Sequence, residues 1–259
     1  MLWYMKFVYG ILFLAVLVLA CGCTTVPADN STSVPAPSAT ITAGTSANGT
    51  VLAELSSARP NASVALEPGA VVLTFHTDGA EAMEFSFTEG TGTSYGEADD
   101  ILTTGPYSGS LVFGPPDTAE YQLNITSNGT WTAELTRPDS THPLSIPVNL
   151  TGSGAAVSPY FALEKGEYIF ARDETGFSSP LYELRFANGS VVMDANNTCV
   201  LPCIGEGSAH PFVIIEIPEN GSYLLGAIPR SSPHPWNVTI SAVPTVPQMG
   251  PGPVVSQQM

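Results

Sequence analysis

One pair of cysteines in this sequence is close enough along the chain for local chemistry. Cys199 and Cys203 are separated by Val-Leu-Pro. Outside the cytoplasm such a pair is expected to form a disulfide that closes a small loop. Free thiols and a metal site are the alternatives, and His210 is the near candidate for a further metal ligand.

Three carboxylates form a second candidate site, because Glu97, Asp99 and Asp100 fall together in residues 90–105. A hard cation needs several oxygen ligands that converge from a loop, and this segment offers carboxylates and carbonyls. The sequence therefore allows a calcium site, with an ordinary solvated acidic loop as the alternative. No other cofactor is expected.

Catalytic motifs are missing from the sequence. It contains no G-x-S-x-G, H-E-x-x-H, P-loop or EF-hand pattern. The four histidines, His76, His142, His210 and His234, show no spacing to a nucleophile, and three of them precede proline, which favours extended loops. A copper or zinc site built from them is the alternative to solvent-exposed loop histidines. We expect a protein that is not an enzyme.

Aromatic side chains allow two interpretations. Tyr95 and Tyr107 are the candidates for an exposed strip that would stack on sugars. Trp131 and Trp236 could do the same, but each lies in an alternating apolar pattern, Trp-x-Ala-x-Leu and Trp-x-Val-x-Ile. That alternation predicts that both tryptophans belong to a buried core.

Net charge excludes one class of partner. The 259 residues contain 23 Asp+Glu and 7 Lys+Arg, for a formal net charge of -16. A chain without a basic stripe cannot displace the counterions of nucleic acid, so no nucleic-acid partner is expected, and anionic headgroups are disfavoured too. The 24 Gly and 23 Pro residues favour a loop-rich β protein.

The N-terminus has the pattern of a targeting segment. Lys6 precedes an apolar run over residues 7–20, which is short for a membrane span and typical of a signal peptide. The run ends in Val-Leu-Ala-Cys21, which resembles the lipobox of prokaryotic lipoproteins. That resemblance implies cleavage before Cys21, a lipid on its thiol, and a protein held at the outer face of the cell membrane. Lipidation of Cys23, an uncleaved anchor and a plain secretory signal are the alternatives.

Asparagine usage points to the same compartment. Of 11 Asn residues, all but Asn197 begin an Asn-x-Ser/Thr sequon, whereas a chain with roughly a fifth Ser and Thr would have about two by chance. Lipobox and sequons together favour an archaeal exported glycoprotein. The expected glycosylation sites are Asn30, Asn48, Asn61, Asn124, Asn128, Asn149, Asn188, Asn196, Asn220 and Asn237.

Composition and an internal repeat divide the chain. We expect a signal peptide over 1–20, a lipidated N-terminus and disordered Ser/Thr/Pro stalk over 21–50, and a disordered Pro-rich tail over 245–259. Between them, residues 51–140 and 147–244 align as two repeats: Leu-Glu-x-Gly recurs, and later Tyr121 meets Tyr223 and Trp131 meets Trp236. Residues 142–147 form the linker.

Each repeat has the pattern of antiparallel β-strands. Short alternating runs are separated by Gly, Pro and Asn-Gly turns, and the Asn-Gly at 128–129 and at 188–189 each predict a hairpin. The series Phe161-Ala-Leu-Glu-Lys-Gly-Glu-Tyr-Ile-Phe, Tyr182-Glu-Leu-Arg-Phe-Ala-Asn-Gly and Gly221-Ser-Tyr-Leu-Leu resembles pre-peptidase C-terminal-type modules, which also occur in exported proteins of methanogenic archaea. The resemblance implies two tandem jelly-roll-like β-sandwiches and an accessory, non-catalytic role.

Three functions therefore stay open. The first is a non-catalytic, glycosylated, lipid-anchored cell-surface protein that acts as an envelope or interaction module, with envelope proteins or glycans as partners. The second is a carbohydrate-binding module, which needs an exposed aromatic strip beside polar groups. The third is an extracytoplasmic hydrolase with an irregular site, for which a cluster of ionisable side chains would be the sign.

Overall fold

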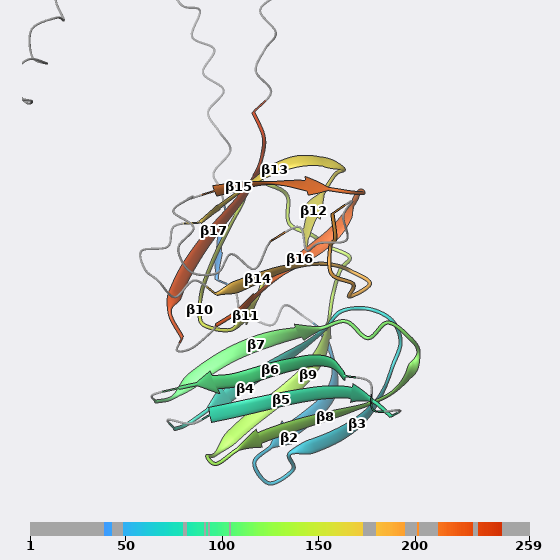
Figure 1. Cartoon of the computed structure of the whole chain (residues 1–259), viewed down its shortest axis with the longest axis vertical. Coiled ribbons are helices and arrows are strands. Elements are labelled where there is room, and N and C mark those ends of the chain that lie inside the picture. Colours follow the sequence, from blue (N-terminus) through green and yellow to red (C-terminus); the bar gives the residue numbers. More distant parts are fainter. Residues whose placement is uncertain are drawn as a thin grey trace, which may run out of the picture. The chain divides into compact units, whose positions relative to one another are not determined.

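The computed structural model describes 39–42, 49–79, 82–90, 92, 94–103, 105–172, 180–194, 201, 212–229 and 233–244, and for 39–42, 94–100 and 102 it describes the backbone alone. All of these residues belong to one compact unit, Pro37–Met259. Every regular element among them is a β-strand (Figure 1). Within these ranges, no helix is long and apolar enough to cross a membrane.

The first sandwich is built from two four-stranded sheets. Its strands are β2 (Gly49–Ser56), β3 (Asn61–Leu66), β4 (Val71–Thr77), β5 (Ala82–Glu89), β6 (Ser94–Leu102), β7 (Tyr107–Phe113), β8 (Ala119–Ser127) and β9 (Trp131–Pro138). One sheet has the order β2-β9-β4-β7 and the other β3-β8-β5-β6, with antiparallel pairing throughout. Numbered within the sandwich, the orders are 1-8-3-6 and 2-7-4-5, which is the jelly-roll arrangement.

The second sandwich repeats this order. Its strands are β10 (Val148–Ser153), β11 (Ala156–Val157), β12 (Phe161–Leu163), β13 (Gly166–Arg172), β14 (Leu181–Phe186), β15 (Phe212–Ile217), β16 (Gly221–Ile228) and β17 (Pro235–Ala242). The first sheet contains β10-β17-β13-β15, and in the second β16 lies between β14 and the two short strands β11 and β12. With β11 and β12 counted together as the second strand, β14 is the fourth, and within the described residues a bridge between Arg185 and Val191 takes the place of the fifth. Both repeats are therefore jelly-roll sandwiches, as the sequence predicted.

Each sandwich has its own apolar core, and the predicted inward faces are confirmed. Trp131 is 2% exposed in the first core and Trp236 is 3% exposed in the second. The alternating neighbours of both tryptophans are buried with them, because successive side chains of a strand point to opposite faces. These neighbours are Ala133, Leu135, Val238 and Ile240. The tryptophans are core residues and not a surface platform for sugars.

Two further details recur in both repeats. The buried Tyr121 donates its hydroxyl to the carbonyl of Asp117 at 3.0 Å, and the buried Tyr223 donates to the carbonyl of Glu219 at 2.6 Å, so each bond reaches back four residues. Gly69, two residues before β4, and Gly166, the first residue of β13, are paired by the sequence alignment and have φ angles of 140° and 152°. Only glycine adopts such angles without strain, which explains its presence in both repeats.

The two Asn-Gly dipeptides behave differently. At 188–189 the chain reverses as predicted: Gly189 has a φ of 86°, and the N–H of Phe186 donates to the carbonyl of Ser190. At 128–129 the predicted hairpin is wrong, because β8 and β9 lie in different sheets and do not pair. The turn there carries the chain from one sheet of the sandwich to the other.

Part of the predicted stalk is also a strand. β1 (Ala39–Thr42) pairs in parallel with β10, so this stretch of the expected disordered segment belongs to the first sheet of the second sandwich. Its Ala-Thr-Ile-Thr sequence is rich in β-branched residues, and the edge of β10 supplies partners for its backbone. The chain thus enters its folded unit at the second sandwich before it forms the first.

The sandwiches pack on each other through the outer faces of β4 and β7 on one side and β11 and β16 on the other. A cluster of buried side chains joins these faces: Ala70, Val72, Val112, Val157, Tyr160 and Leu224. The backbones approach closely, since a Cβ atom added to Gly226 would lie 2.9 Å from Cγ1 of Val112. The short linker therefore joins two docked domains and not two separate ones.

Candidate functional site

Polar side chains form two rows across the outer face of the sheet β2-β9-β4-β7. In one row Glu54 lies opposite Glu134, and Glu134 lies opposite Thr74. The other row contains Ser56, Thr132, His76 and Ser108. Because strand residues alternate between faces, the apolar residues between these positions point into the core.

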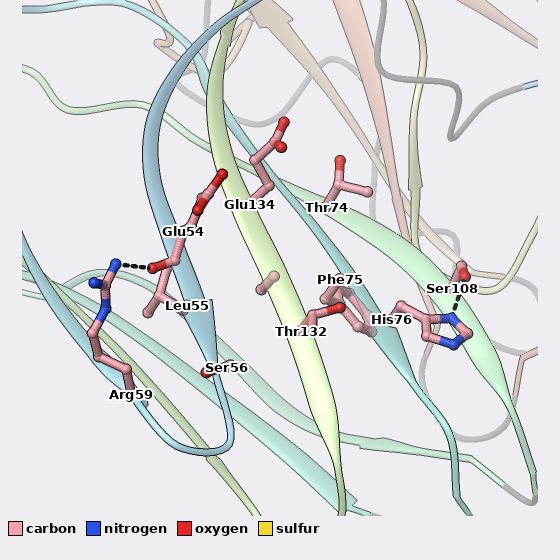
Figure 2. Close-up of a pocket in the computed structure, with 11 residues that line it drawn as sticks. Glu54, Leu55, Ser56, Arg59, Thr74, Phe75, His76, Ser108, Thr132 and Glu134 are labelled. Carbon is pink, nitrogen blue, oxygen red and sulfur yellow. Dashed lines mark hydrogen bonds between the residues drawn. The ribbon is translucent and has the colours of Figure 1, made fainter.

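These polar side chains line an open hollow of about 630 Å³ on this face (Figure 2). The buried Leu55 and Phe75 contribute to its floor. Arg59, in the turn after β2, lies at one side and donates from its guanidinium to the backbone carbonyl of Glu54 at 2.6 Å. Figure 2 shows Glu54 and Glu134 projecting from neighbouring strands above this floor. Like charges directly opposite each other destabilise a sheet, so this pair is a cost that a ligand could offset.

A chain of hydrogen bonds crosses the other side of the hollow. Nδ1 of His76 lies 2.8 Å from Oγ of Ser108, and Nε2 lies 3.1 Å from Oδ1 of Asp78. The order of hydroxyl, imidazole and carboxylate is that of a nucleophile, its base and the group that orients the base. However, the side chain of His76 is 49% exposed and that of Asp78 is 67% exposed. Water competes for all three groups, so the arrangement suits hydrogen bonding to a polar ligand better than activation of the hydroxyl.

The sequence did not reveal this cluster. His76 lies on β4 and Asp78 directly follows that strand, so the two are only two residues apart, and that spacing was visible in the sequence. Ser108 joins them only because the register of β4 and β7 places it opposite His76. The register depends on the whole sheet, so the spacing of the histidines along the sequence could not show that His76 meets Ser108.

Tyr107 does not lie on a ligand-binding surface but between the two sandwiches. Its hydroxyl donates to the carbonyl of Ser153 at 3.2 Å and accepts the N–H of Ala155 at 2.6 Å. Its ring lies 5.9 Å from that of Phe75, and burial raises the pKa of the phenol to about 12. A side chain bound in this way cannot also stack on a sugar. The side chain of Tyr95, on β6, is outside the described part of the chain.

The acidic segment is a strand and not the expected loop. Glu97 pairs with Ser86 across β5 and β6, while Asp99 and Asp100 occupy a bulge between Ala98 and Ile101. The side chains of Glu97, Asp99 and Asp100 lie outside the described part of the chain, so the calcium site stays a prediction. Within the described residues, no group of three or more His, Cys, Asp or Glu could hold a metal ion.

The modification sites are described only in part. Cys21, Cys199, Cys203, Asn30, Asn48 and Asn196 lie outside the described residues. The sequon residues with exposed side chains are Asn61, Asn124, Asn128, Asn188 and Asn220. Asn149 and Asn237, on neighbouring strands, are partly buried. Oδ1 of Asn149 accepts the hydroxyl of Thr239, and Oδ1 of Asn237 is buried without a hydrogen-bond partner in the described structure.

Comparisons with known proteins do not place this chain in a family. No family model matches the chain. No curated protein matches it. One solved structure, described as "Crystal Structure of the STIV MCP", is similar over 76% of this chain and 95% of that chain, with 7% sequence identity and a TM-score of 0.20. The jelly-roll fold of this chain is shown by the strand order of its own sheets.

Proposed function

We propose that this chain is a non-catalytic cell-surface protein, lipid-anchored through Cys21 and N-glycosylated, that acts as an envelope or interaction module. The observation that carries the proposal is the open hollow on the first sandwich. It presents hydrogen-bonding side chains from four strands to solvent, and the cluster of Ser108, His76 and Asp78 beside it is solvent-exposed. The lipobox and the sequons supply the anchor and the modification.

The tether would join the second sandwich. The lipobox precedes β1, and β1 pairs with β10 of that sandwich. The segment between Cys21 and Ala39 is then the whole tether, shorter than the stalk expected from composition. This connection leaves the hollow on the sandwich that the tether does not join.

Replacement of the lipidated cysteine tests the anchor. We expect Cys21→Ser to move the protein from the membrane fraction to the medium, because one thiol carries the lipid. Cys23→Ser is the matched control and should stay in the membrane fraction. If Cys21→Ser stays in the membrane fraction and Cys23→Ser is released, Cys23 is the lipidated residue. Retention of both variants would contradict the lipid anchor.

Carbohydrate binding in the hollow is the second candidate function. Carboxylates, an imidazole and hydroxyls on rigid strands match the donors and acceptors of a sugar. We expect a glycan array to identify a ligand whose binding is weakened by Glu134→Gln and by His76→Ala. Glu84→Gln, at an exposed position on β5, is the matched control and should bind normally. Equal binding by all three variants would exclude the hollow as the site.

The same cluster allows the non-catalytic proposal to be tested. A fluorophosphonate reacts with an activated serine and ignores an ordinary surface hydroxyl. We expect no labelling of Ser108. Labelling that disappears in both Ser108→Ala and His76→Ala would overturn the proposal in favour of a hydrolase.

A further inference from the structure

The sixth strand of each sandwich, β7 in the first and β15 in the second, occupies the same place in the jelly roll. The strand registers show which residues of β7 and β15 are equivalent. Val72 pairs with Val112 across β4 and β7, and Ile169 pairs with Ile214 across β13 and β15. The same register makes Phe212 the counterpart of Ser110.

In the first sandwich this strand is covered by the second sandwich. Val72 and Val112 are 8% and 6% exposed within the cluster between the domains. The edge of β7 is also used, because the N–H of Ser110 donates to the carbonyl of Ala155 at 3.1 Å. Oγ of Ser110 accepts the N–H of Val157 at 2.8 Å. Both the outer face and the edge of β7 are therefore part of an interface.

In the second sandwich the equivalent surface is apolar and open. Phe212 is 53% exposed and Ile214 is 55% exposed. β15 is the last strand of its sheet, and no described strand pairs with its outer edge. An exposed edge strand with apolar side chains is a template for pairing with another strand.

We propose that the edge of β15 is a homodimer interface, in which β15 pairs antiparallel with β15 of a second copy of this chain. Antiparallel pairing of a strand with itself is a two-fold contact and closes at two copies. With Ile214 at the two-fold axis, Phe212 of one copy lies opposite Glu216 of the other, so the two Glu216 carboxylates stay apart. The apolar outer positions of the two copies then form one continuous strip.

Other partners fit this edge less well. Head-to-tail stacking would place β15 against the second sheet of another copy's first sandwich. In the second sandwich the interface positions of this sheet are Val157, Leu224 and Gly226. The equivalent positions in the first sandwich are Asn61, Gln122 and Asn124. These are exposed and polar, and two of them begin sequons. An anionic lipid surface is disfavoured by the exposed Glu167 and Glu216, which pair at one end of the apolar patch, and by the net charge of -16.

Sedimentation of the full chain in detergent tests the dimer. We expect the mass of two chains for the unaltered protein and of one chain for Ile214→Lys, with unchanged thermal stability at low concentration. Val51→Lys is the matched control, since Val51 is 50% exposed on the first sandwich, and it should stay dimeric. In native membranes, Ile214→Cys should cross-link to its own copy and Val51→Cys should not.

Three results would overturn the proposal. The first is an unaltered protein that sediments as a monomer, and the second is equal dissociation by Ile214→Lys and Val51→Lys. The third is a monomeric protein whose Cys21→Ser variant binds phosphatidylcholine vesicles. If Ile214→Lys then abolishes that binding, the patch belongs to a lipid surface instead.

Discussion

The two sandwiches share a fold and differ in the faces that they bury. The first has the strand orders 1-8-3-6 and 2-7-4-5, and the second has the same orders with a bridge in place of the fifth strand. Each has a core tryptophan on its last strand and a tyrosine that bonds four residues back. The second sheet of the first sandwich presents Asn61 and Asn124 to solvent, whereas the same sheet of the second buries Val157 and Leu224. The inward residues therefore preserve the fold of a repeat, and the outward residues decide which repeats associate.

The core tryptophans should give the largest effect. We expect Trp131→Ala and Trp236→Ala each to lower the free energy of unfolding by about 3–5 kcal/mol, because a buried ring is replaced by a cavity. Trp236 should lie at the upper end, since its Nε1–H also donates to the carbonyl of Gly154 at 3.0 Å. Thermal melts measure both, with Thr132→Ala as an exposed control.

Limited proteolysis of the same variants tests whether the two cores are separate. Trp131→Ala should leave a resistant fragment near 147–244, and Trp236→Ala one near 51–140, because each tryptophan belongs to a different cluster. Loss of both halves in either variant would mean that the docked interface makes the pair a single cooperative unit.

The matched positions on β7 and β15 should respond unequally. Val112→Asp places an unpaired carboxylate among buried apolar groups and should cost about 2–4 kcal/mol. Ile214→Asp, at the equivalent exposed position, should change the stability of the single chain by less than about 0.5 kcal/mol. Urea unfolding at low protein concentration measures both. Equal losses would contradict the difference between the two strands.

Alkaline pH should lower the free energy of unfolding of the two docked sandwiches. Burial raises the pKa of Tyr107 and of Tyr160 to about 12, from 10.0. The folded state thus favours the neutral phenols, and their contribution is complete below pH 10 and is lost as the pH rises towards 12. For the well-buried Tyr160 the loss is on the order of 1–3 kcal/mol. Urea unfolding across this pH range should show a smaller loss for Tyr160→Phe, and an unchanged slope would contradict burial of the phenol.

Glycan occupancy should give the smallest effect and should follow exposure. We expect fuller occupancy at Asn61 and Asn124, which are exposed, than at Asn149 and Asn237, which are partly buried on the first sheet of the second sandwich. Mass spectrometry of glycopeptides measures the four sites. Equal occupancy would show that modification precedes folding or that the outer face of this sheet opens.

Local pattern was enough to predict the sandwiches and their cores. Alternation in Trp131-Thr-Ala-Glu-Leu135 specifies one buried face whatever lies on the other side, because the period of a strand is two. The same logic failed at Asn128-Gly129, where the dipeptide predicts a turn but cannot say whether the next strand joins the same sheet. Alternation also places Val72 on the outward side of its strand, and only the packing of the second sandwich buries it.

The sequence by itself thus determined the β class, the repeat, the inward residues and the absence of a catalytic motif, since each depends on neighbours within a few residues or on self-similarity. Only the tertiary structure decided that Ser108 meets His76, that Tyr107 bridges two domains and that β1 joins the second sandwich. Each of these contacts depends on strand register and domain docking, which are set by the sum of many side-chain contacts and leave no local pattern in the chain.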